Sequence, residues 1–583
     1  MNEEPKSIWK KSWKGWRGLL LWMASLTVFM FLLTMIVLWL LPGRKEVSEM
    51  VGIALIDALA VGVLAVLIVV FVRSLCCWRN FKRFLFGLSC FITLVALFYA
   101  EEDWRGKHAW ENFKREWEAK GERFDRASVI PPAVPDDQNF ALTPIVFTSY
   151  GQMLTREGRE IPFKDRDTNF VNRLDMNIYY TQDNAPTNGD WRVARITDLR
   201  AWQRYYREVA AKTNLFPVPA QPQSPAADVL LALSKYDSTI EELREAAKLP
   251  YSRFPLEYDK DDPWAILLPH LAQLKKCSQV LQLRALAELQ NGQSDQALAD
   301  VKLMLRLVDS IRTEPFLISH LVRIVMVNIA LQPVWEGLSE HRWSDTQLTE
   351  LDRELAQLNF LSSYNLAMRS ELVLSQTAAI DNLRRHPETI NELFNNFSGS
   401  SSSSPVRVVD RLIPTGWFYQ NQIRCARLMV EFYLPVADTN QRTVSPALVR
   451  QSDAAVEADI KQSTPYNFIE SALMPALGKA VRKFANGQCS VDLARTAIAL
   501  ERYRLVHGEF PDKLDALTPQ FIAKLPHDVI GGQPLHYRRT ADGQFILYSV
   551  GWNETDDDGK VVLNEHGAVD IGAGDWVWRY PAQ

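Results

Sequence analysis

Residues 281–311 read LQLRALAELQNGQSDQALADVKLMLRLVDSI, and they decide the fold class of the larger part of this chain. Their apolar side chains recur at intervals of three and four residues, which places them along one face of a helix. Asn291 and Gly292 form a typical helix end, and Ser294 starts a second run with the same spacing. The stretch therefore predicts two helices joined by a tight turn.

Two more helices are predicted directly after this hairpin. They cover residues 316–339 and 345–358, and Ser344 is the expected N-cap of the second. Residues 283–310 resemble one tetratricopeptide-type unit, but a solenoid needs about three units. Because the chain shows no clear period of about 34 residues, we expect residues 140–465 to form an irregular, mainly helical domain.

The composition of the whole chain bounds its class. The 583 residues include 65 Lys+Arg and 69 Asp+Glu, for a net charge of -4. This length predicts several structural units, because domains usually hold about 100 to 200 residues. The charge balance does not favour a broadly basic surface, so no nucleic-acid partner is expected. Apolar residues are concentrated in the first hundred positions, which indicates a membrane region.

Three apolar segments are predicted to span a membrane within residues 18–100. Gly18–Leu41 is uncharged over 24 residues and exceeds the thickness of a hydrocarbon core. Val51–Val72 is interrupted only by Asp57, and Phe84–Ala100 is uncharged but has only 17 residues. The third segment is therefore the marginal one.

The orientation follows from the Lys and Arg residues beside these segments. Five lie in the N-terminal tail, residues 1–17, two follow the first segment, and four lie between the second and third. The positive-inside rule then places residues 1–17 in the cytoplasm and residues 101–583 outside. The expectation is a multi-pass protein with a large extracytoplasmic domain; if the third segment does not span, that domain is cytoplasmic.

Residues 101–139 predict an amphipathic helix followed by a proline-rich linker. The aromatic residues on one face of the helix are Trp110, Phe113, Trp117 and Phe124. They fit either the membrane interface or packing against the protein's own domain. The linker reads PPAVPDDQNFALTP, and three prolines in five positions exclude a helix there.

The remainder of the 140–465 domain gives weaker signals. Short strands are expected at residues 144–147 and 176–180, with a helix at 198–212. Residues 398–405 read SGSSSSSP, a flexible low-complexity loop that divides the helical region.

The last segment, residues 466–583, predicts a helix followed by a β-hairpin. One helical face is marked by Leu493, Ala497, Leu500 and Tyr503. Gly508 is the expected end of this helix. Strands at 535–538 and 544–549 are joined by a turn of hairpin length. We therefore expect a small α+β module at the C-terminus.

This segment resembles a known family in its motifs and their order. The motifs are DLARTAIALERYRLVHGEFPDKLDALTPQFIAKLP, PLHYRR, FILYSVG and VDIGAGDWVW. They are similar to the globular part of a type II secretion major pseudopilin, which implies a long helix on a small antiparallel sheet and a late acidic loop that holds calcium. A pseudopilin starts with a cleavable leader and one membrane helix, whereas this segment lies at the far end of a chain with several predicted spans. Assembly into a pilus is therefore not implied. The whole layout also resembles uncharacterised bacterial membrane proteins, which implies a bacterial inner membrane.

An acidic loop in this segment is the candidate metal site. Residues 553–570 carry six acidic side chains, and calcium takes six to eight oxygen ligands. The spacing approaches an EF-hand, but Glu554 replaces the first Asp and the loop follows a strand. The resemblance implies main-chain carbonyls with Asp570 instead, and it leaves Asn553 and Asp556 as alternatives. The predicted ligands are Asn553, Asp556, Asp558 and Asp570. The competing interpretation is a solvated acidic turn.

The sequence contains no catalytic motif that names a reaction. A nucleophile elbow, a zinc-protease motif and a phosphate-binding loop are all missing. The cysteines of the soluble part, Cys277, Cys425 and Cys489, are too far apart for a zinc pattern, although one disulfide stays open. We expect a membrane-anchored extracytoplasmic interaction or assembly protein, associated with an envelope or secretion apparatus, with a calcium-stabilised C-terminal module. The alternative is an extracytoplasmic hydrolase whose catalytic groups meet only in the folded chain.

Overall fold

The structure is a computed structural model, mainly helical, with 61% helix and 7% strand. It describes residues 18, 22–34, 36, 47–75, 78–181, 185–260, 265–390, 413–462, 464–469 and 477–581. The chain divides into two compact units, Met1–Glu101 and Glu102–Gln583. The predicted mainly α fold with small sheets is confirmed, and the serine-rich loop 398–405 lies outside the described residues.

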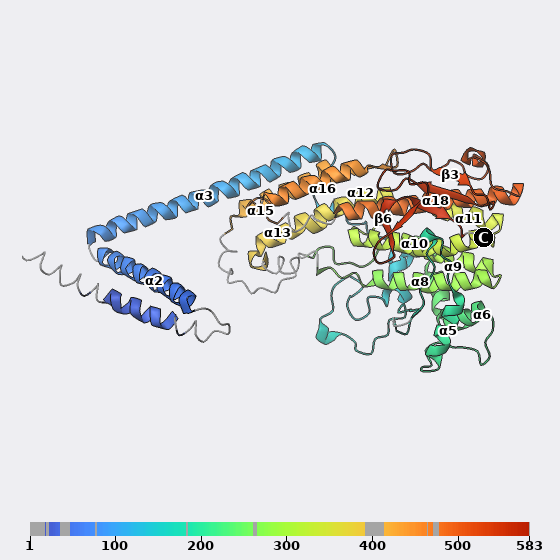
Figure 1. Ribbon diagram of the computed structural model, residues 1–583, viewed down its shortest axis with the longest axis horizontal. Coiled ribbons are helices and arrows are strands. Elements are labelled where there is room, and N and C mark those ends of the chain that lie inside the picture. The colour runs from blue at the N-terminus through green and yellow to red at the C-terminus, as the bar shows by residue number, and fades with distance from the viewer. Residues whose placement is uncertain are drawn as a thin grey trace, which may run out of the picture. The chain divides into compact units, whose positions relative to one another are not determined.

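The N-terminal unit consists of apolar helices. Helix α2 covers Val47–Leu75, and helix α3 begins at Trp78 and runs to Ala119 (Figure 1). The predicted segment Phe84–Ala100 lies within α3, where the apolar window has no buried residue. In the other two predicted segments, the described apolar stretches are Trp22–Thr34 and, within α2, Ala54–Ala65, and each is shorter than a span.

Two helices among the described residues are long and apolar enough to cross a membrane. They are α3 and α10, the latter at Leu317–Ser339. Of the apolar window in α10, 61% is buried, as in the core helix of a soluble domain. The exposed apolar stretch of α3 supports association with a membrane.

The second half of α3 belongs to the larger unit. Trp110 and Phe113 are buried, and both rings contact Phe124. Packing on the protein's own domain is therefore the observed arrangement. The helix backbone approaches helix α15 (Thr415–Leu428) so closely that a Cβ on Gly106 would overlap the backbone of Gly416.

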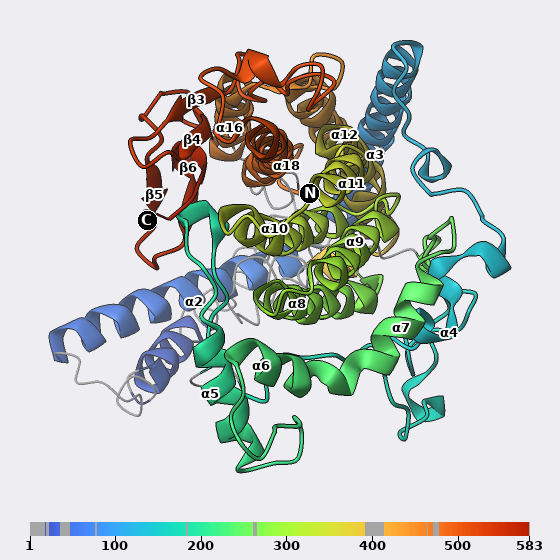
Figure 2. The ribbon, with the colours of Figure 1, turned by 90° about the vertical axis from the view of Figure 1, so that its right-hand side faces the viewer.

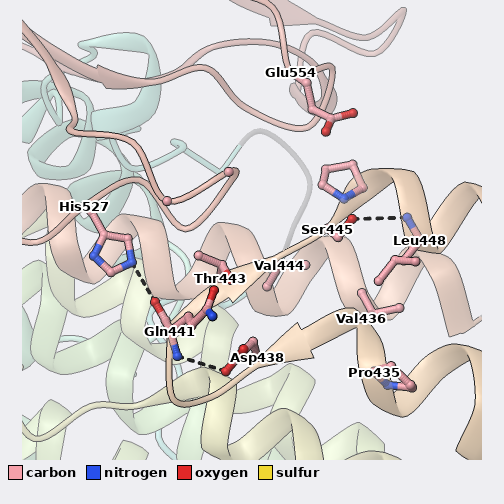
Figure 3. Close-up of a pocket in the computed structure, with 13 residues that line it drawn as sticks. Pro435, Val436, Asp438, Gln441, Thr443, Val444, Ser445, Leu448, His527 and Glu554 are labelled. Carbon is pink, nitrogen blue, oxygen red and sulfur yellow. Dashed lines mark hydrogen bonds between the residues drawn. The ribbon is translucent and has the colours of Figure 1, made fainter.

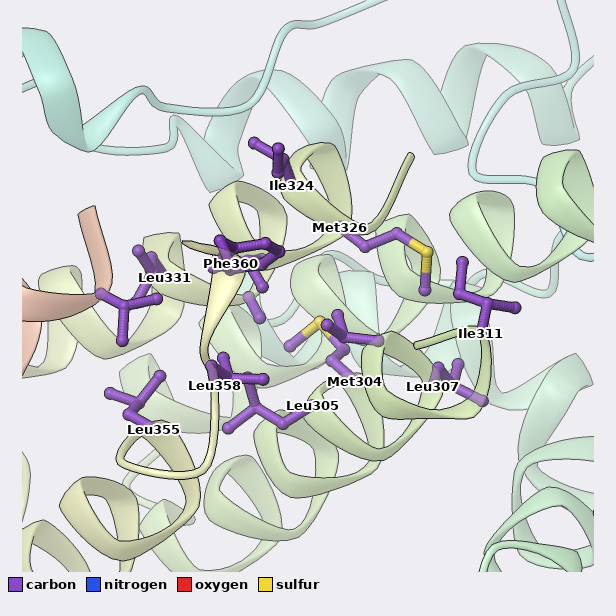
Figure 4. Packing of buried hydrophobic residues seen from close by; sticks show 14 of the residues in the cluster. Met304, Leu305, Leu307, Ile311, Ile324, Met326, Leu331, Leu355, Leu358 and Phe360 are labelled. Carbon is purple, nitrogen blue, oxygen red and sulfur yellow. The ribbon is translucent and has the colours of Figure 1, made fainter. Parts of the chain in front are cut away.

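The predicted helical hairpin is confirmed as α8, Pro269–Gln290, and α9, Ser294–Ser310. They are followed by α10 and by α11, Asp345–Leu355, which starts with the capping box Ser344–Gln347. Helices α8 and α10 lie side by side, and α18 packs against the other side of α10 (Figure 2). Apolar side chains of α9 and α10 meet between the layers, as Met304 and Met326 do (Figure 4).

Helix α18, Leu477–His507, is longer than the sequence predicted. Its residues are buried on nearly every turn up to Glu501, so its first half lacks an amphipathic pattern. Gly487 lets it approach α10, since an added Cβ would lie 3.0 Å from Ile324. The helix contacts α10, α11 and α12 as well as the C-terminal sheet.

The C-terminal sheet is antiparallel, in the order β3-β4-β7. Strands β3 (His536–Arg539) and β4 (Phe545–Ser549) confirm the predicted hairpin, and β7 is Trp576–Arg579. Leu547 faces Tyr537 on one side and Trp578 on the other. Separate pairs are formed by β5 (Val561–Leu563) with β6 (Val569–Gly574), and by β1 (Ala437–Asp438) with β2 (Thr443–Val444).

The strands expected at 144–147 and 176–180 are wrong. Residues Pro144–Phe147 form the short helix α4, with proline in its first turn. Residues 176–180 form no strand because side chains satisfy their backbone: Tyr236 Oη accepts from Asn177 N, and Tyr205 Oη accepts from Tyr180 N. The helix expected at 198–212 is confirmed as α5, Leu199–Ala210.

The larger unit contains further elements among its described residues. The α-helices are α6 Pro225–Leu233, α7 Asp237–Ala246, α12 Phe360–Ser370, α13 Ala378–Arg385 and α16 Pro446–Lys461. Two π-helical segments are Glu371–Thr377 and Met429–Tyr433. The 3-10 turns are Arg126–Ser128, Asp136–Gln138, Phe140–Leu142, Phe163–Asp165, Trp191–Val193, Ser234–Tyr236, Pro387–Thr389, Leu434–Val436 and Leu514–Leu517.

Candidate functional site

The acidic loop after β4 is folded around a carboxylate of the protein itself. Asp575, which precedes β7, accepts hydrogen bonds from the backbone N–H groups of Asp557 and Gly559, at 3.3 and 2.7 Å. Its burial raises the pKa of Asp575 above the ordinary value for an aspartate. Asp575 is not among the ligands predicted from the sequence, because the family resemblance implies Asp570 instead.

The predicted ligands each bond to neighbours. Asp556 accepts from Tyr548 Oη and from the backbone N–H of Asp558, both at 3.0 Å. The Asp558 N–H, with smaller contributions from Tyr548 and nearby cations, lowers the pKa of Asp556. The Asn553 amide donates to Asp557, at 2.8 Å.

The carboxylates of the other two predicted ligands have different partners. The Asp558 carboxylate is largely exposed and is 3.3 Å from the Arg538 guanidinium. Asp570 accepts from the backbone N–H of Gly572, at 2.8 Å. Across the described residues, no three His, Cys, Asp or Glu side chains are grouped so that they could hold a metal ion. Calcium binding therefore stays a prediction.

A pocket of about 510 Å³ lies beside the acidic loop, lined by the β1–β2 hairpin, His527 and Glu554 (Figure 3). Its polar groups have local partners. His527 Nε2 is 3.0 Å from the carbonyl oxygen of Gln441, and Ser445 caps α16. Glu554 forms an ion pair with Arg450, at 2.7 Å. The pocket is thus a depression between neighbouring helices and loops. These polar side chains bond to the surrounding protein.

A buried histidine cluster has the residue types of a catalytic site. His270 Nδ1 is 2.7 Å from Tyr150 Oη, and His270 Nε2 is 2.6 Å from Glu314. Ser319 donates to the same carboxylate, at 2.5 Å. His270 and Tyr150 are 0% exposed, and the Phe254 ring stacks on the imidazole. Because no substrate can reach the imidazole in this arrangement, the cluster is a structural network.

A second pocket, of about 400 Å³, lies between α8 and α10 and beneath the 187–195 loop. Its lining includes five amide side chains, together with Asp190, Arg192 and Arg195. Gln282 accepts from Asn188 and donates to the Ile329 carbonyl, at 2.5 and 3.1 Å. Gln332 accepts from the Trp191 backbone N–H, at 2.6 Å. Fixed amides and a nearby indole suit binding of a neutral polar group better than acid–base chemistry.

Beneath this pocket, the carboxylate of Glu336 has a strongly raised pKa. Glu336 accepts from Thr197 N and Oγ1, at 3.0 and 2.8 Å, and from Gln332, at 2.8 Å. Its burial raises the pKa of Glu336 to about 7, against the opposing effect of these hydrogen bonds. The side chain holds the 187–197 region against α10.

The cysteines do not form the disulfide that the sequence left open. Cys277, Cys425 and Cys489 are all buried, Cys277 and Cys489 are free thiols, and Cys90 is exposed. Burial raises the pKa of the Cys277 thiol to about 12, which makes it a poor nucleophile.

Comparison of the chain with family models, with curated proteins and with solved structures returned no match. The function therefore has to be argued from the geometry above.

Proposed function

We propose that this chain is a membrane-anchored interaction or assembly protein, with three N-terminal spans in a bacterial inner membrane and a large extracytoplasmic unit. One observation carries the proposal. Helix α3 contains an exposed apolar stretch and continues into a segment that forms part of the core of the larger unit.

The exposure of α3 changes sharply along its length. Phe86 and Leu94 are 73% and 65% exposed, whereas Glu102 and Trp110 are 5% and 7% exposed. A contiguous apolar surface of this kind marks contact with a membrane or a partner. An uncharged helical stretch of this length favours the membrane.

The buried end of this helix is held by specific contacts. Glu102 accepts from Trp417 Nε1, at 3.0 Å, and from Arg105, at 2.5 Å. Asp103 accepts from the Gly416 backbone N–H, at 2.7 Å. An apolar helix whose end is buried and hydrogen-bonded in the larger unit fits a protein that holds this unit at a membrane surface.

An interaction role is favoured over the hydrolase alternative by the sites found. Within the described ranges, the His270 cluster is sealed, and the one carboxylate that lines the pocket between α8 and α10, Asp190, is ion-paired with Arg192. An extracytoplasmic hydrolase would need accessible, convergent acid–base groups. The partly exposed apolar face of α10, which includes Ile318 and Val325, is in contrast a feature expected of a protein-binding surface.

The proposal includes a calcium-stabilised C-terminal module and a link to an envelope or secretion apparatus. Its support is the packing of α18 on the β3-β4-β7 sheet, with the acidic loop directly after β4. This is the arrangement that the pseudopilin resemblance implies.

The anchor is tested with charge substitutions in α3. Ile92→Lys and Leu94→Lys each add about 3 kcal/mol to the cost of insertion at a helix centre, so in the double variant the third segment should fail to span. The first two spans should keep the chain in the alkali-resistant membrane fraction, and a reporter fused after Gln583 should move to the cytoplasmic side. Trp104→Lys is the matched control, since Trp104 is 68% exposed in the same helix but follows the apolar stretch.

The topology is tested with a reporter fused after Gln583. We expect activity only on the extracytoplasmic side. A wild-type chain that is released by alkali, or a reporter active only in the cytosol, contradicts the proposal.

A further inference from the structure

One face of α10 carries apolar side chains that are open to solvent. Ile318 and Val325 are 51% and 44% exposed, and Leu321, Val322 and Ile329 are only partly buried. These residues recur at three- and four-residue intervals, so they form one stripe along the helix. The stripe is about 16 Å long, from the helical rise of 1.5 Å per residue. We call it the α10 stripe.

The two helices beside α10 run parallel to it. On one side, His270 at the start of α8 bonds to Glu314, just before α10, and Gln282 further along α8 donates to the carbonyl of Ile329. On the other side, Phe484 near the start of α18 contacts His320 near the start of α10. Glu501 near the end of α18 bonds to His341, just after α10. The α10 stripe therefore has a parallel helix along each edge.

Lysines project from both neighbouring helices on the side of the stripe. Lys275 lies one turn before Gln279, on the α8 face that lines the pocket. Lys479 and Lys483 share a face of α18, four residues apart and next to the contacts with α10. All three are exposed, and within the described part of the chain none forms an ion pair.

Nearby acidic groups are already neutralised by other cations. Asp175 is 2.7 Å from Lys276, and Asp190 is 2.8 Å from Arg192. The lysines beside the stripe therefore present positive charge along an apolar strip. A surface of this kind is complementary to a chain segment that is apolar on one face and acidic at its edges.

The spacing of the helices fits a helical occupant. Neighbouring helix axes are about 8–10 Å apart, so α8 and α18 are separated by about two such distances, and a helix about 10 Å wide fits over α10 between them. The stripe also ends at the pocket between α8 and α10, since Val325 and Ile329 contribute to its lining.

We propose that the α10 stripe and its flanking lysines bind an acidic amphipathic helix of a partner protein. The inference rests on the proposed interaction function, because it names the partner chemistry for the larger unit. Leucine-type side chains of the partner pack on Ile318 and Val325, and its carboxylates face Lys275, Lys479 and Lys483.

The experiment uses the full chain in phosphatidylcholine nanodiscs. The probe is a fluorescent synthetic peptide of about 14 residues, with leucine at helical a and d spacing and glutamate at most other positions. A peptide with lysine in place of glutamate tests the charge, and empty nanodiscs give the background. Binding is measured by fluorescence anisotropy.

The variants separate the apolar and charged contributions. Val325→Glu should weaken binding of the acidic peptide about tenfold or more. Lys479→Glu and Lys483→Glu should each weaken it about two- to fivefold, and less at high salt. The matched controls Val506→Glu and Lys524→Glu change exposed residues outside the stripe and should leave binding unchanged.

Several outcomes overturn the proposal. They are no saturable binding to the wild type, equal binding of the lysine peptide, or equal losses in the control variants. Self-association of the wild type that Val325→Glu abolishes, without peptide binding, would assign the stripe to a contact between copies of this chain. If the peptide fails while fractionation and the reporter behave as expected, the stripe assignment fails and the anchored unit stands.

Discussion

Gly416→Ala is the sharpest test of the contact between α3 and α15. In most helices this exchange stabilises by about 0.5–1 kcal/mol. Here a Cβ on Gly416 would overlap the carbonyl oxygen of Glu102 and lie 2.5 Å from its carbonyl carbon. A Cβ has no torsion that could move it away, so the backbones have to separate. Overpacking of this kind costs about 1–3 kcal/mol.

The apolar surface that the α3 segment buries decides whether Gly416→Ala displaces that segment. Release of the α3 segment would expose Trp110 and Phe113, which are 7% and 6% exposed. Each aromatic side chain buries about 150–250 Å², worth about 4–6 kcal/mol at about 25 cal/mol per Å². Undocking therefore costs more than the overlap. We expect the segment to stay docked and stability to fall by the overlap cost.

The assay is denaturant unfolding of the full chain in detergent, followed by tryptophan fluorescence. Gly87→Ala is the matched control, because Gly87 lies in α3, the other helix of this contact, with nothing within 4 Å of an added Cβ. An unchanged or higher midpoint for Gly416→Ala would refute the close contact. Faster tryptic cleavage at Arg105 or Lys114 would refute the estimate that burial outweighs the overlap.

Three further predictions concern pH, calcium and the buried histidine. The pKa of Glu336, about 7, is above its unfolded value, so the native state holds the extra proton and stability should fall as pH rises from about 4.5 to 7; denaturant unfolding should show that Glu336→Gln flattens this slope. Millimolar calcium should raise the melting temperature, and Asp558→Ala and Asp570→Ala should lose the response; no response in the wild type removes the site. Tyr150→Phe leaves His270 Nδ1 without its buried partner and should cost about 1–3 kcal/mol in denaturant unfolding, whereas no loss would show that the bond contributes little.

The sequence predicted those elements whose signal is local. The α8–α9 hairpin follows from periodicity and from the Asn291-Gly292 stop, and the β3–β4 hairpin follows from two short strands around one turn. The strand expected at 176–180 failed because its backbone bonds to Tyr205 and Tyr236, which are remote in the sequence. Periodicity contains no information on such partners.

The candidate sites were harder to predict for the same reason. The acidic loop was found from its composition, but Asp575 supplies the carboxylate that bonds to its backbone from 16 and 18 residues away. The amide pocket joins side chains from α8, α10 and the 187–195 loop. The apolar character of α10 predicted a helix, yet only the packing of α8 and α18 shows which of its faces stays open.

Strand β7 completes the core around α10 and the 191–193 turn. Trp335 in α10 donates to the Arg579 carbonyl, at 3.0 Å, and the Trp191 ring lies 5.1 Å from that of Trp578. A growing polypeptide can therefore close these contacts only after residue 579 has been added. Chains cut short by a premature stop codon would present unpaired tryptophan surfaces to chaperones and proteases, and quality control should remove them even when every earlier helix has formed.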